Sequence, residues 1–383
     1  MPEVSPKVAV VLISAGTAIA YWLTGLAGLQ LTLADGQISP VWPATGVALF
    51  CLVRWGWRAA PGVLIGALLA TWEFGAPPLG VLFNGLGNTL AAVAAWQVLR
   101  LVGFRPELDR IRDAVALIVL GGVAAVALSA TLGTSALIAA EAMPAEQFWT
   151  TWAIWLTGDL MGVLMVAPAL FALWYQRPQV ARPQRVRIEA AVLITATVCA
   201  AVLGTETSIG ILFPTVIPLI WAAVRFQLLG AASCALLTSV LVSLAAIEGN
   251  GPFAGKTVLA TMIALQVYNG SLALIALLLS TAITERNKAQ AAVEETCEVL
   301  ADALTRLGEK TGLGERTLAA IRRATTAPEP EAGLEQAIAT VLSDDEPTTP
   351  VNPADSASVV RVGVIDDRRP RRVAEDPARR TRT

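Results

Sequence analysis

Asp159 lies near the centre of the apolar stretch TWAIWLTGDLMGVLMVAPALFALW, residues 151–174. This stretch is long enough to cross a bilayer as a helix, and an ionised carboxylate at that depth costs about 3 kcal/mol or more. Because ionisable residues inside membranes mark ligand sites, ion pathways or proton relays, Asp159 is the first candidate for chemistry. Its predicted partners are Asn84, Asn88 and Trp155. A purely structural bond to one of the asparagines is the alternative interpretation.

Two further segments put polar side chains at membrane depth. In FNGLGNTLAAVAAW, residues 83–96, the two asparagines lie four residues apart and therefore on one helix face. They either bond to a neighbouring helix, which stabilises the bundle, or contact a ligand. In LSATLGTSAL, residues 128–137, Thr131 is one of four hydroxyl residues that either bond to their own helix backbone or face Asp159.

A third segment, SPVWPATGVALF, opens an apolar run with Trp42 and Pro43, followed by Gly46. Proline at the start of a helix replaces a backbone donor that has no partner there, and tryptophan anchors helices at the membrane surface. The segment is therefore either a capped helix start or the lining of a mouth that a small ligand can touch.

Several kinds of chemistry are missing from the sequence. The chain has no histidine, and its four cysteines have no paired spacing: Cys51, Cys199, Cys234 and Cys297. This pattern supports neither a disulfide framework nor a zinc cluster. The stretch EGNGPFAGKTVLA, residues 248–260, lacks the first glycine of a phosphate-binding loop, since Asn250 stands in that place. We expect no metal, no cofactor and no enzymatic activity.

The composition places this polar chemistry in a membrane protein. Of 383 residues, 55% are hydrophobic and 15% charged, and the mean hydropathy is +0.61. Residues 1–288 hold 15 Lys/Arg and 13 Asp/Glu, whereas the last 95 residues hold 13 and 17. This shift in charge density predicts a lipid-embedded body followed by a solvated end. The net charge of −2 gives no reason to expect nucleic acid as a partner.

The expected fold class is all-α, a polytopic bundle of about ten transmembrane helices. Apolar runs of suitable length recur down to residue 284, and the N-terminal run lacks a cleavage site, so we read it as a retained span. The predicted spans are residues 8–29, 38–53, 59–74, 79–101, 114–139, 151–174, 188–204, 209–224, 228–247 and 258–283. Fewer spans with re-entrant segments would break the alternation of loop charges described next.

The loops between these spans alternate in basic content. Of the 15 Lys/Arg before residue 289, 14 fall in loops on one side, and Lys256 is the exception. Basic loops face the cytoplasm, so we expect a plasma-membrane or inner-membrane protein with both termini inside the cell.

A weak internal similarity relates spans two to four to spans eight to ten. Arg54 follows Pro43 by eleven residues, and Arg225 follows Pro214 by the same distance. NTLAAVAAW and NGSLALIAL are also similar. Such a repeat is common among transporters.

The end of the chain differs from the bundle. We expect residues 1–284 to form the membrane bundle, 285–343 a cytoplasmic helical linker, and 344–383 a disordered, arginine-rich tail. Apolar residues in the linker recur by four and three, which predicts a short coiled coil that relays a signal: Val293, Cys297, Leu300, Leu304 and Leu307. The alternative is a helix that covers the inner face of the bundle.

Taken in order, SPVWPATGVALF, NGLGNTLAAVAAWQVLR, LSATLGTSAL and WLTGDLMGVLMVAPAL resemble the MASE family, the membrane-associated sensor domain of the first type. The resemblance covers about residues 10–284. It implies a bacterial sensory domain that acts upstream of an output module, and by position it marks Trp42, Pro43, Gly46, Asn88, Thr131, Gly158, Asp159 and Pro168. Where the family often has an acid after the asparagine, this chain has Ala91 and Ala92, which leaves Asp159 without a second carboxylate.

Two hypotheses follow for function. In the first, the bundle senses a small ligand or the state of the membrane and signals through residues 283–307. No kinase, cyclase or phosphodiesterase motif is present, so its partner is a separate cytoplasmic signalling protein, or a second copy of the chain. In the second, the bundle is a secondary transporter for a small solute, coupled to protons through Asp159.

Overall fold

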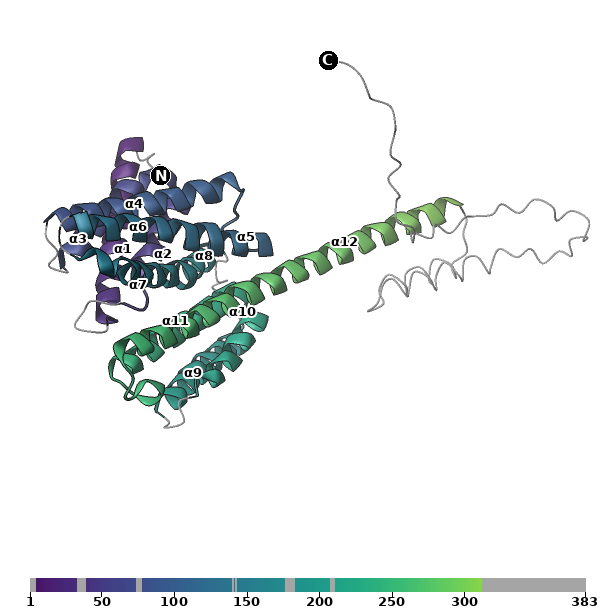
Figure 1. Ribbon diagram of the computed structural model, residues 1–383. Helices are drawn as coiled ribbons and strands as arrows, with labels where there is room; N and C mark the ends of the chain where they lie inside the picture. Colours follow the sequence, from purple (N-terminus) through teal and green to yellow (C-terminus); the bar gives the residue numbers. More distant parts are fainter. Residues whose placement is uncertain are drawn as a thin grey trace, which may run out of the picture. The chain divides into compact units, whose positions relative to one another are not determined.

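The computed structural model describes residues 5–32, 39–73, 78–139, 141, 143–175, 183–206 and 211–311, and all regular structure in them is helical. The chain divides into two compact units, Met1–Val293 and Glu294–Thr383. Figure 1 shows the longer helices by label. In chain order the helices are α1 (Pro6–Gln30), α2 (Pro43–Trp55), η1 (Gly56–Arg58), α3 (Ala60–Glu73), α4 (Pro78–Leu101), α5 (Ile111–Ala116), η2 (Leu117–Ala124), α6 (Ala125–Ala139), η3 (Ala145–Gln147), α7 (Phe148–Met161), η4 (Gly162–Val166), α8 (Ala167–Tyr175), α9 (Gln184–Glu206), η5 (Phe213–Thr215), α10 (Val216–Ile247), η6 (Gly251–Phe253), α11 (Val258–Leu274), η7 (Ile275–Leu279) and α12 (Ser280–Thr311).

The predicted all-α polytopic bundle is confirmed, but the number of spans differs from the predicted ten. Within the described residues, seven helical stretches are long and apolar enough to cross a membrane: Pro6–Gln30, Pro78–Leu101, Ile111–Ala139, Ala145–Tyr175, Gln184–Glu206, Phe213–Ile247 and Val258–Ala303. The predicted second and third spans correspond to α2 and α3, which have 13 and 14 residues. Both are shorter than the roughly 20 residues that a helix needs to span a bilayer. The predicted eighth and ninth spans lie in one element, α10.

The turn between α2 and α3 reverses the direction of the chain. Gly28 near the end of α1 lies against Trp42 and Pro43 at the start of α2, so α1 and α2 run antiparallel. Gly62 near the start of α3 lies against Ser14 near the start of α1, so α1 and α3 run parallel. The reversal occurs at Gly56, whose φ of 62° and ψ of −145° suit glycine.

The element α10 contains a second reversal of the same kind, at Gln227 (φ 53°, ψ −144°). Before it, Arg225 pairs with Glu189 in the first turns of α9 at 2.9 Å. After it, Cys234 lies 3.5 Å from Thr197 in the middle of α9. Residues 216–226 therefore run antiparallel to α9, and residues 228–247 run parallel to it. Gly56 and Gln227 each stand two residues after the arginines of the predicted repeat, and their matching backbone angles support that repeat.

Three long helices each contain a π-helical segment, namely η2, η4 and η7. The segment η4 begins three residues after Asp159, and η7 directly precedes α12. Such segments are rare and concentrate at functional sites. The three segments are also linked by packing contacts. The segment η4 contacts η2 directly, and it reaches η7 through α10, which contacts both η4 and η7.

Burial in the bundle suits a lipid environment. The largest core cluster joins α1 to α4 with α8, through large side chains such as Tyr21, Leu49 and Phe171. On the outside, apolar side chains such as Leu12, Leu203 and Val267 are 62%, 62% and 66% exposed. In water, such exposed apolar surfaces would promote aggregation. In a bilayer, the hydrocarbon chains of the lipid cover them, and no unfavourable contact with water remains.

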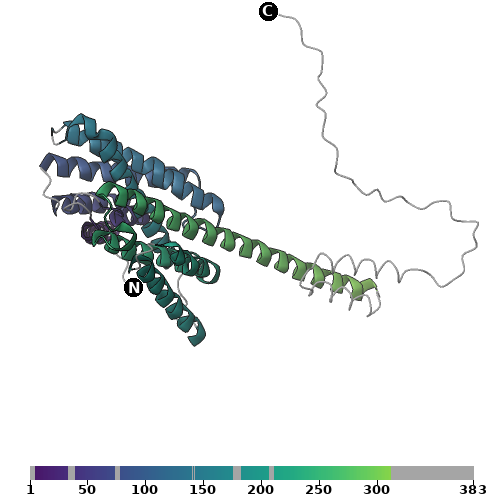
Figure 2. The same cartoon turned by 60° about the horizontal axis from the view of Figure 1, so that its bottom comes forward.

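Helix α12 continues from α11 and η7 as one unbroken helix (Figures 1 and 2). Among the predicted relay residues, Val293 is 55% exposed, Leu300 is 44% exposed and Cys297 is half-buried. Leu304 and Leu307 belong to the helix, but their side chains lie outside the described residues. The coiled coil therefore stays a prediction, as do the helical linker beyond residue 311 and the tail 344–383, which also lie outside the described part.

Candidate functional site

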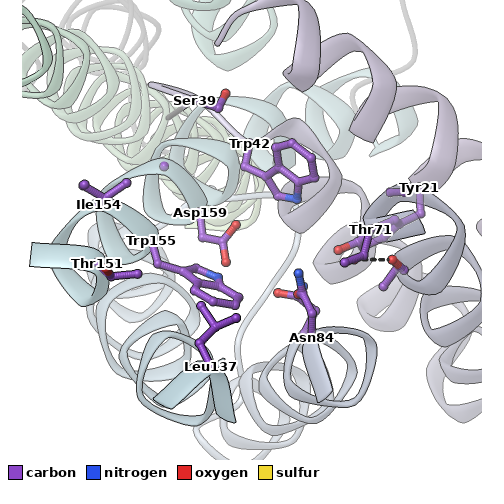
Figure 3. Close-up of a pocket in the computed structure, with 14 residues that line it drawn as sticks. Tyr21, Ser39, Trp42, Thr71, Asn84, Leu137, Thr151, Ile154, Trp155 and Asp159 are labelled. Atoms are coloured by element: carbon purple, nitrogen blue, oxygen red, sulfur yellow. Dashed lines mark hydrogen bonds between the residues drawn. The ribbon is translucent and has the colours of Figure 1, made fainter. Parts of the chain in front are cut away.

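A cavity of about 280 Å³ lies among α1, α3, α4, α6, α7 and the residues that lead into α2. Figure 3 shows side chains from these elements around it. Five of the six residues predicted to bind or sense a ligand line this cavity: Trp42, Asn84, Asn88, Trp155 and Asp159. Residues more than 100 positions apart in the chain are thus brought to one place.

Of the residues that the structure describes, Asp159 is the only charged one that lines the cavity. It is 3% exposed, and its Oδ1 atom accepts a hydrogen bond of 2.7 Å from the hydroxyl group of Thr45. The indole of Trp155 lies beside the same carboxyl group (Figure 3). The Oδ2 atom is buried and has no hydrogen-bond partner among the described residues. The described residues contain no hydrogen bond between Asp159 and an asparagine, which is the bond that the alternative interpretation requires.

The backbone around Asp159 is locked to the start of α2. The N–H of Trp42 donates to the carbonyl oxygen of Gly158 at 2.9 Å. A Cβ atom on Gly162 would lie 1.9 Å from the carbonyl oxygen of Trp42, and one on Gly46 would lie 2.3 Å from that of Gly162. Only glycine permits this approach, so the Trp-Pro-x-x-Gly and Gly-Asp motifs form a single contact.

The two asparagines of α4 form a hydrogen-bonded pair, in which Asn88 Nδ2 donates to Asn84 Oδ1. The hydroxyl group of Ser129 in α6 donates to Asn88 Oδ1 at 3.1 Å. Both amide oxygens are therefore engaged by other side chains. The pair joins α4 to α6, as the structural interpretation predicts, and it also faces the cavity.

Thr131 does not join this site. Its side chain is exposed and donates to the carbonyl oxygen of Ala127 at 2.7 Å, while Trp152 Nε1 donates to it at 3.0 Å. Pro43 occupies the first turn of α2, and Pro168 is buried in α8. Both prolines shape the helices around the cavity without lining it.

The sequence did not single out several residues of the cavity. Tyr21 is 1% exposed, and its hydroxyl group is hydrogen-bonded to the indole of Trp42. Ser39 and Thr71 line the same space. Thr45 has the most direct role among the residues that the sequence did not single out, because its hydroxyl group donates a hydrogen bond to the carboxyl group of Asp159. Its place three residues after Trp42 put it on the correct helix, but hydroxyl groups in helices usually bond to their own backbone, which hides such a role.

A second cavity, of about 540 Å³, lies where three of the basic loops meet α12. Glu107, Arg225 and Lys288 are among the residues that line it. Lys288 of α12 pairs with Asp109 at 2.5 Å, and Arg105 lies 3.2 Å from the same carboxylate oxygen. Burial by itself raises the pKa of Asp109, but the hydrogen bond and charge of Lys288, with the charge of Arg105, outweigh it and hold the pKa below its ordinary value of 3.8.

A further contact fixes α12 one turn earlier. The carboxylate of Glu285 accepts a hydrogen bond of 2.9 Å from the backbone N–H of Ile111, the first residue of α5. Together with the Lys288–Asp109 pair, it forms an anchor that joins the beginning of α12 to the loop between α4 and α5. No group of three or more potential metal ligands occurs in the described part of the chain.

Comparison with known proteins gives one family. The model of the MASE1 family matches residues 11–287 of this chain, which covers all of the cavity and the anchor as far as Glu285; Lys288 directly follows the matched residues. No curated protein matches the chain, and no solved structure matches it.

Proposed function

This chain belongs to the MASE1 family of membrane sensory domains, and we propose that it binds a small ligand in the cavity at Asp159 and relays the binding event through α12 to a cytoplasmic partner. The observation that carries this proposal is the buried carboxyl group beside a cavity, with one oxygen atom that has no hydrogen-bond partner among the described residues. A buried polar atom without a partner is costly, and a ligand that bonds to it recovers that cost.

The helices that surround Asp159 offer a route from the cavity to α12. Asp159 lies one turn before the π-helical segment η4, which contacts α10 and α11, and α11 leads through η7 into α12. A second route runs through α4, whose asparagine pair lines the cavity and whose far end leads to the anchor at Asp109. A change at the cavity that shifts either α4 or η4 therefore acts on the first turns of α12.

The ends of the bundle support the predicted orientation in a bacterial inner membrane. Three of the basic loops contribute residues to the second cavity, so they lie at one end of the bundle, beside the beginning of α12. Basic loops face the cytoplasm. With this orientation, the first turns of α12 lie inside the cell, and residues 283–307 are accessible to a signalling protein or to a second copy of the chain.

The relay is tested by photocrosslinking in native membranes. A photoreactive residue at Val293 of α12 captures the partner, and the same residue at Val192, an exposed apolar position of α9, serves as the lipid-facing control. We expect a product specific to Val293, which is either a protein with a kinase, cyclase or phosphodiesterase domain or a dimer of the chain. The Asp159→Asn variant should change its yield. An identical yield in wild type and variant would contradict the relay.

A secondary transporter is the second candidate, favoured by the matching reversals at Gly56 and Gln227. Transport requires flux, whereas sensing requires only binding. Proteoliposomes that hold the purified chain, with a pH gradient imposed across the bilayer, separate the two. We expect no Asp159-dependent proton flux. A flux that disappears in Asp159→Asn would favour transport.

A further inference from the structure

We propose that the ligand of the Asp159 cavity is a small organic cation, an amine or a quaternary ammonium group, held by the carboxylate of Asp159 among aromatic rings. This inference rests on the proposed function, since it names the class of ligand that the same cavity takes.

The charge of the cavity favours a cation. Among the described residues, Asp159 is the only charged side chain that lines it, and no lysine or arginine of this part of the chain does so. An anion would meet an uncompensated carboxyl group, whereas a cation would convert an unpaired buried charge into a pair. The Oδ2 atom of Asp159 offers the acceptor, because Thr45 occupies only Oδ1.

The aromatic residues favour an organic cation. Trp42 and Trp155 lie near the carboxyl group of Asp159 in Figure 3, the indole of Trp155 is also hydrogen-bonded to it, and Tyr21 lines the same cavity. Cations are attracted to the faces of such rings, and aromatic cages are a common way to bind quaternary ammonium groups. Trp155 is fixed in place, since its ring lies against Gly133 of α6, where a Cβ atom would come within 2.1 Å of it.

The donor set around Asp159 is poorly suited to a metal ion. Calcium takes six to eight oxygen ligands, and magnesium demands six in octahedral geometry. Here the oxygen atoms of Asn84 and Asn88 already accept hydrogen bonds from Asn88 and Ser129. No group of three or more acidic, cysteine or histidine ligands accompanies Asp159 in the described part of the chain.

The size of the cavity limits the ligand. Its volume of about 280 Å³ lies just below the range of about 300–1,000 Å³ that is typical of small-molecule sites. A cation of tetramethylammonium or choline size fits this space, whereas a nucleotide or a long peptide does not.

The test measures the thermal unfolding of the purified full-length chain in lipid nanodiscs. Tetramethylammonium chloride is the probe, sodium chloride at equal ionic strength is the salt control, and tert-butanol is a neutral probe of similar shape. We expect tetramethylammonium to raise the Tm in a saturable way, with no comparable effect of sodium chloride or tert-butanol. Asp159→Asn should raise the apparent Kd at least ten-fold.

Two further variants keep the test decisive. Glu146→Gln removes an exposed acid just before α7, outside the cavity, and should leave the effect of tetramethylammonium unchanged. Trp155→Leu removes an aromatic face while it keeps the charge, and should weaken binding even if Asp159→Asn does not fold. If tert-butanol bound in a saturable way and tetramethylammonium did not bind, the proposal of a cationic ligand would be wrong, whereas the proposed function would not be affected. If neither probe changed the Tm of the wild type, the proposal of a cationic ligand would also be wrong. The proposed relay is tested independently by the crosslink at Val293.

Discussion

The hydroxyl group of Thr45 donates a 2.7 Å hydrogen bond to the carboxyl group of Asp159, across 114 positions of sequence. This bond ties the start of α2 to α7 at the point where the backbones of Trp42 and Gly158 also meet. It leaves the second oxygen atom of Asp159 unpartnered in the described structure. The same contact therefore positions the carboxyl group and keeps it available to a ligand.

Replacement of Asp159 by asparagine should leave the fold intact. Asparagine keeps an oxygen atom for Thr45 and removes a buried acid that lacks a cation, so we expect the free energy of unfolding to stay within about 1 kcal/mol of wild type or to rise. Thermal unfolding in nanodiscs measures this. A loss of several kcal/mol, or failure to insert in the membrane, would show that Asp159 has a structural role instead.

Replacement of Gly162 by alanine should disrupt the contact between α2 and η4. The new Cβ atom would lie 1.9 Å from the carbonyl oxygen of Trp42, so the backbones must separate, at a cost of about 1–3 kcal/mol or more. The matched control is Gly16→Ala, because a Cβ atom at Gly16 of α1 meets nothing within 4 Å. We expect Gly162→Ala to lower the Tm and Gly16→Ala to leave it equal or higher. Equal effects of the two would refute the close approach.

The two chain reversals predict substitutions of opposite effect. Gln227 holds a backbone conformation that favours glycine, so Gln227→Gly should stabilise the protein by about 1 kcal/mol. Gly56→Gln puts a side chain into the same conformation, and its Cβ atom would lie 3.3 Å from the ring of Trp96, so it should destabilise. Thermal unfolding of both variants checks the signs. A loss of stability in Gln227→Gly would contradict the shared geometry.

Removal of Lys288 should release the first turns of α12. In Lys288→Met, Arg105 is the remaining ionic partner of Asp109 among the described residues. The side chain of Asp109 is 5% exposed. We expect faster hydrogen exchange of α12 amides near residue 288, with a loss of stability of about 1 kcal/mol, since Lys288 itself is 59% exposed. Lys256→Met, between η6 and α11, is the control. Unchanged exchange in Lys288→Met would mean that the anchor does not hold α12.

The anchor should not respond to pH near neutrality. The folded pKa of Asp109 lies below its ordinary value of 3.8, so its stabilisation is present above 3.8 and is lost only as the pH falls through the lower folded value. We expect equal protection of α12 between about pH 5 and pH 8, after correction for intrinsic exchange. A loss of protection within that window would show that another group titrates at the anchor.

The sequence was sufficient to predict the helical class and the interior position of Asp159, because both depend on the cost of charge in lipid. It also predicted five of the cavity residues, since helical spacing puts polar residues on one face. Thr131 was assigned wrongly because a run of hydroxyl residues does not show which face turns inward, and Ser129 meets Asn88 instead. Thr45 was missed because its bond depends on how two distant helices pack.

The number of spans could not be read from apolar runs alone. Runs at residues 38–53 and 59–74 look long enough, but the helices α2 and α3 are shortened where Gly56 turns the chain. Hydropathy records where lipid is preferred and contains no information on such a turn. The boundary predicted between residues 224 and 228, by contrast, falls at the reversal of Gln227.

The central claim is that the state of Asp159 is transmitted to α12, and disulfide formation at Cys297 tests it most directly. With Cys51, Cys199 and Cys234 changed to serine, Cys297 in native membranes reports the approach of two α12 helices, or of α12 and a partner thiol. A matched chain that keeps only Cys199, which is exposed on α9, is the reference. We expect the rate of crosslinking at Cys297, relative to Cys199, to differ at least three-fold between wild type and Asp159→Asn. Equal rates, with both proteins folded, would contradict the account.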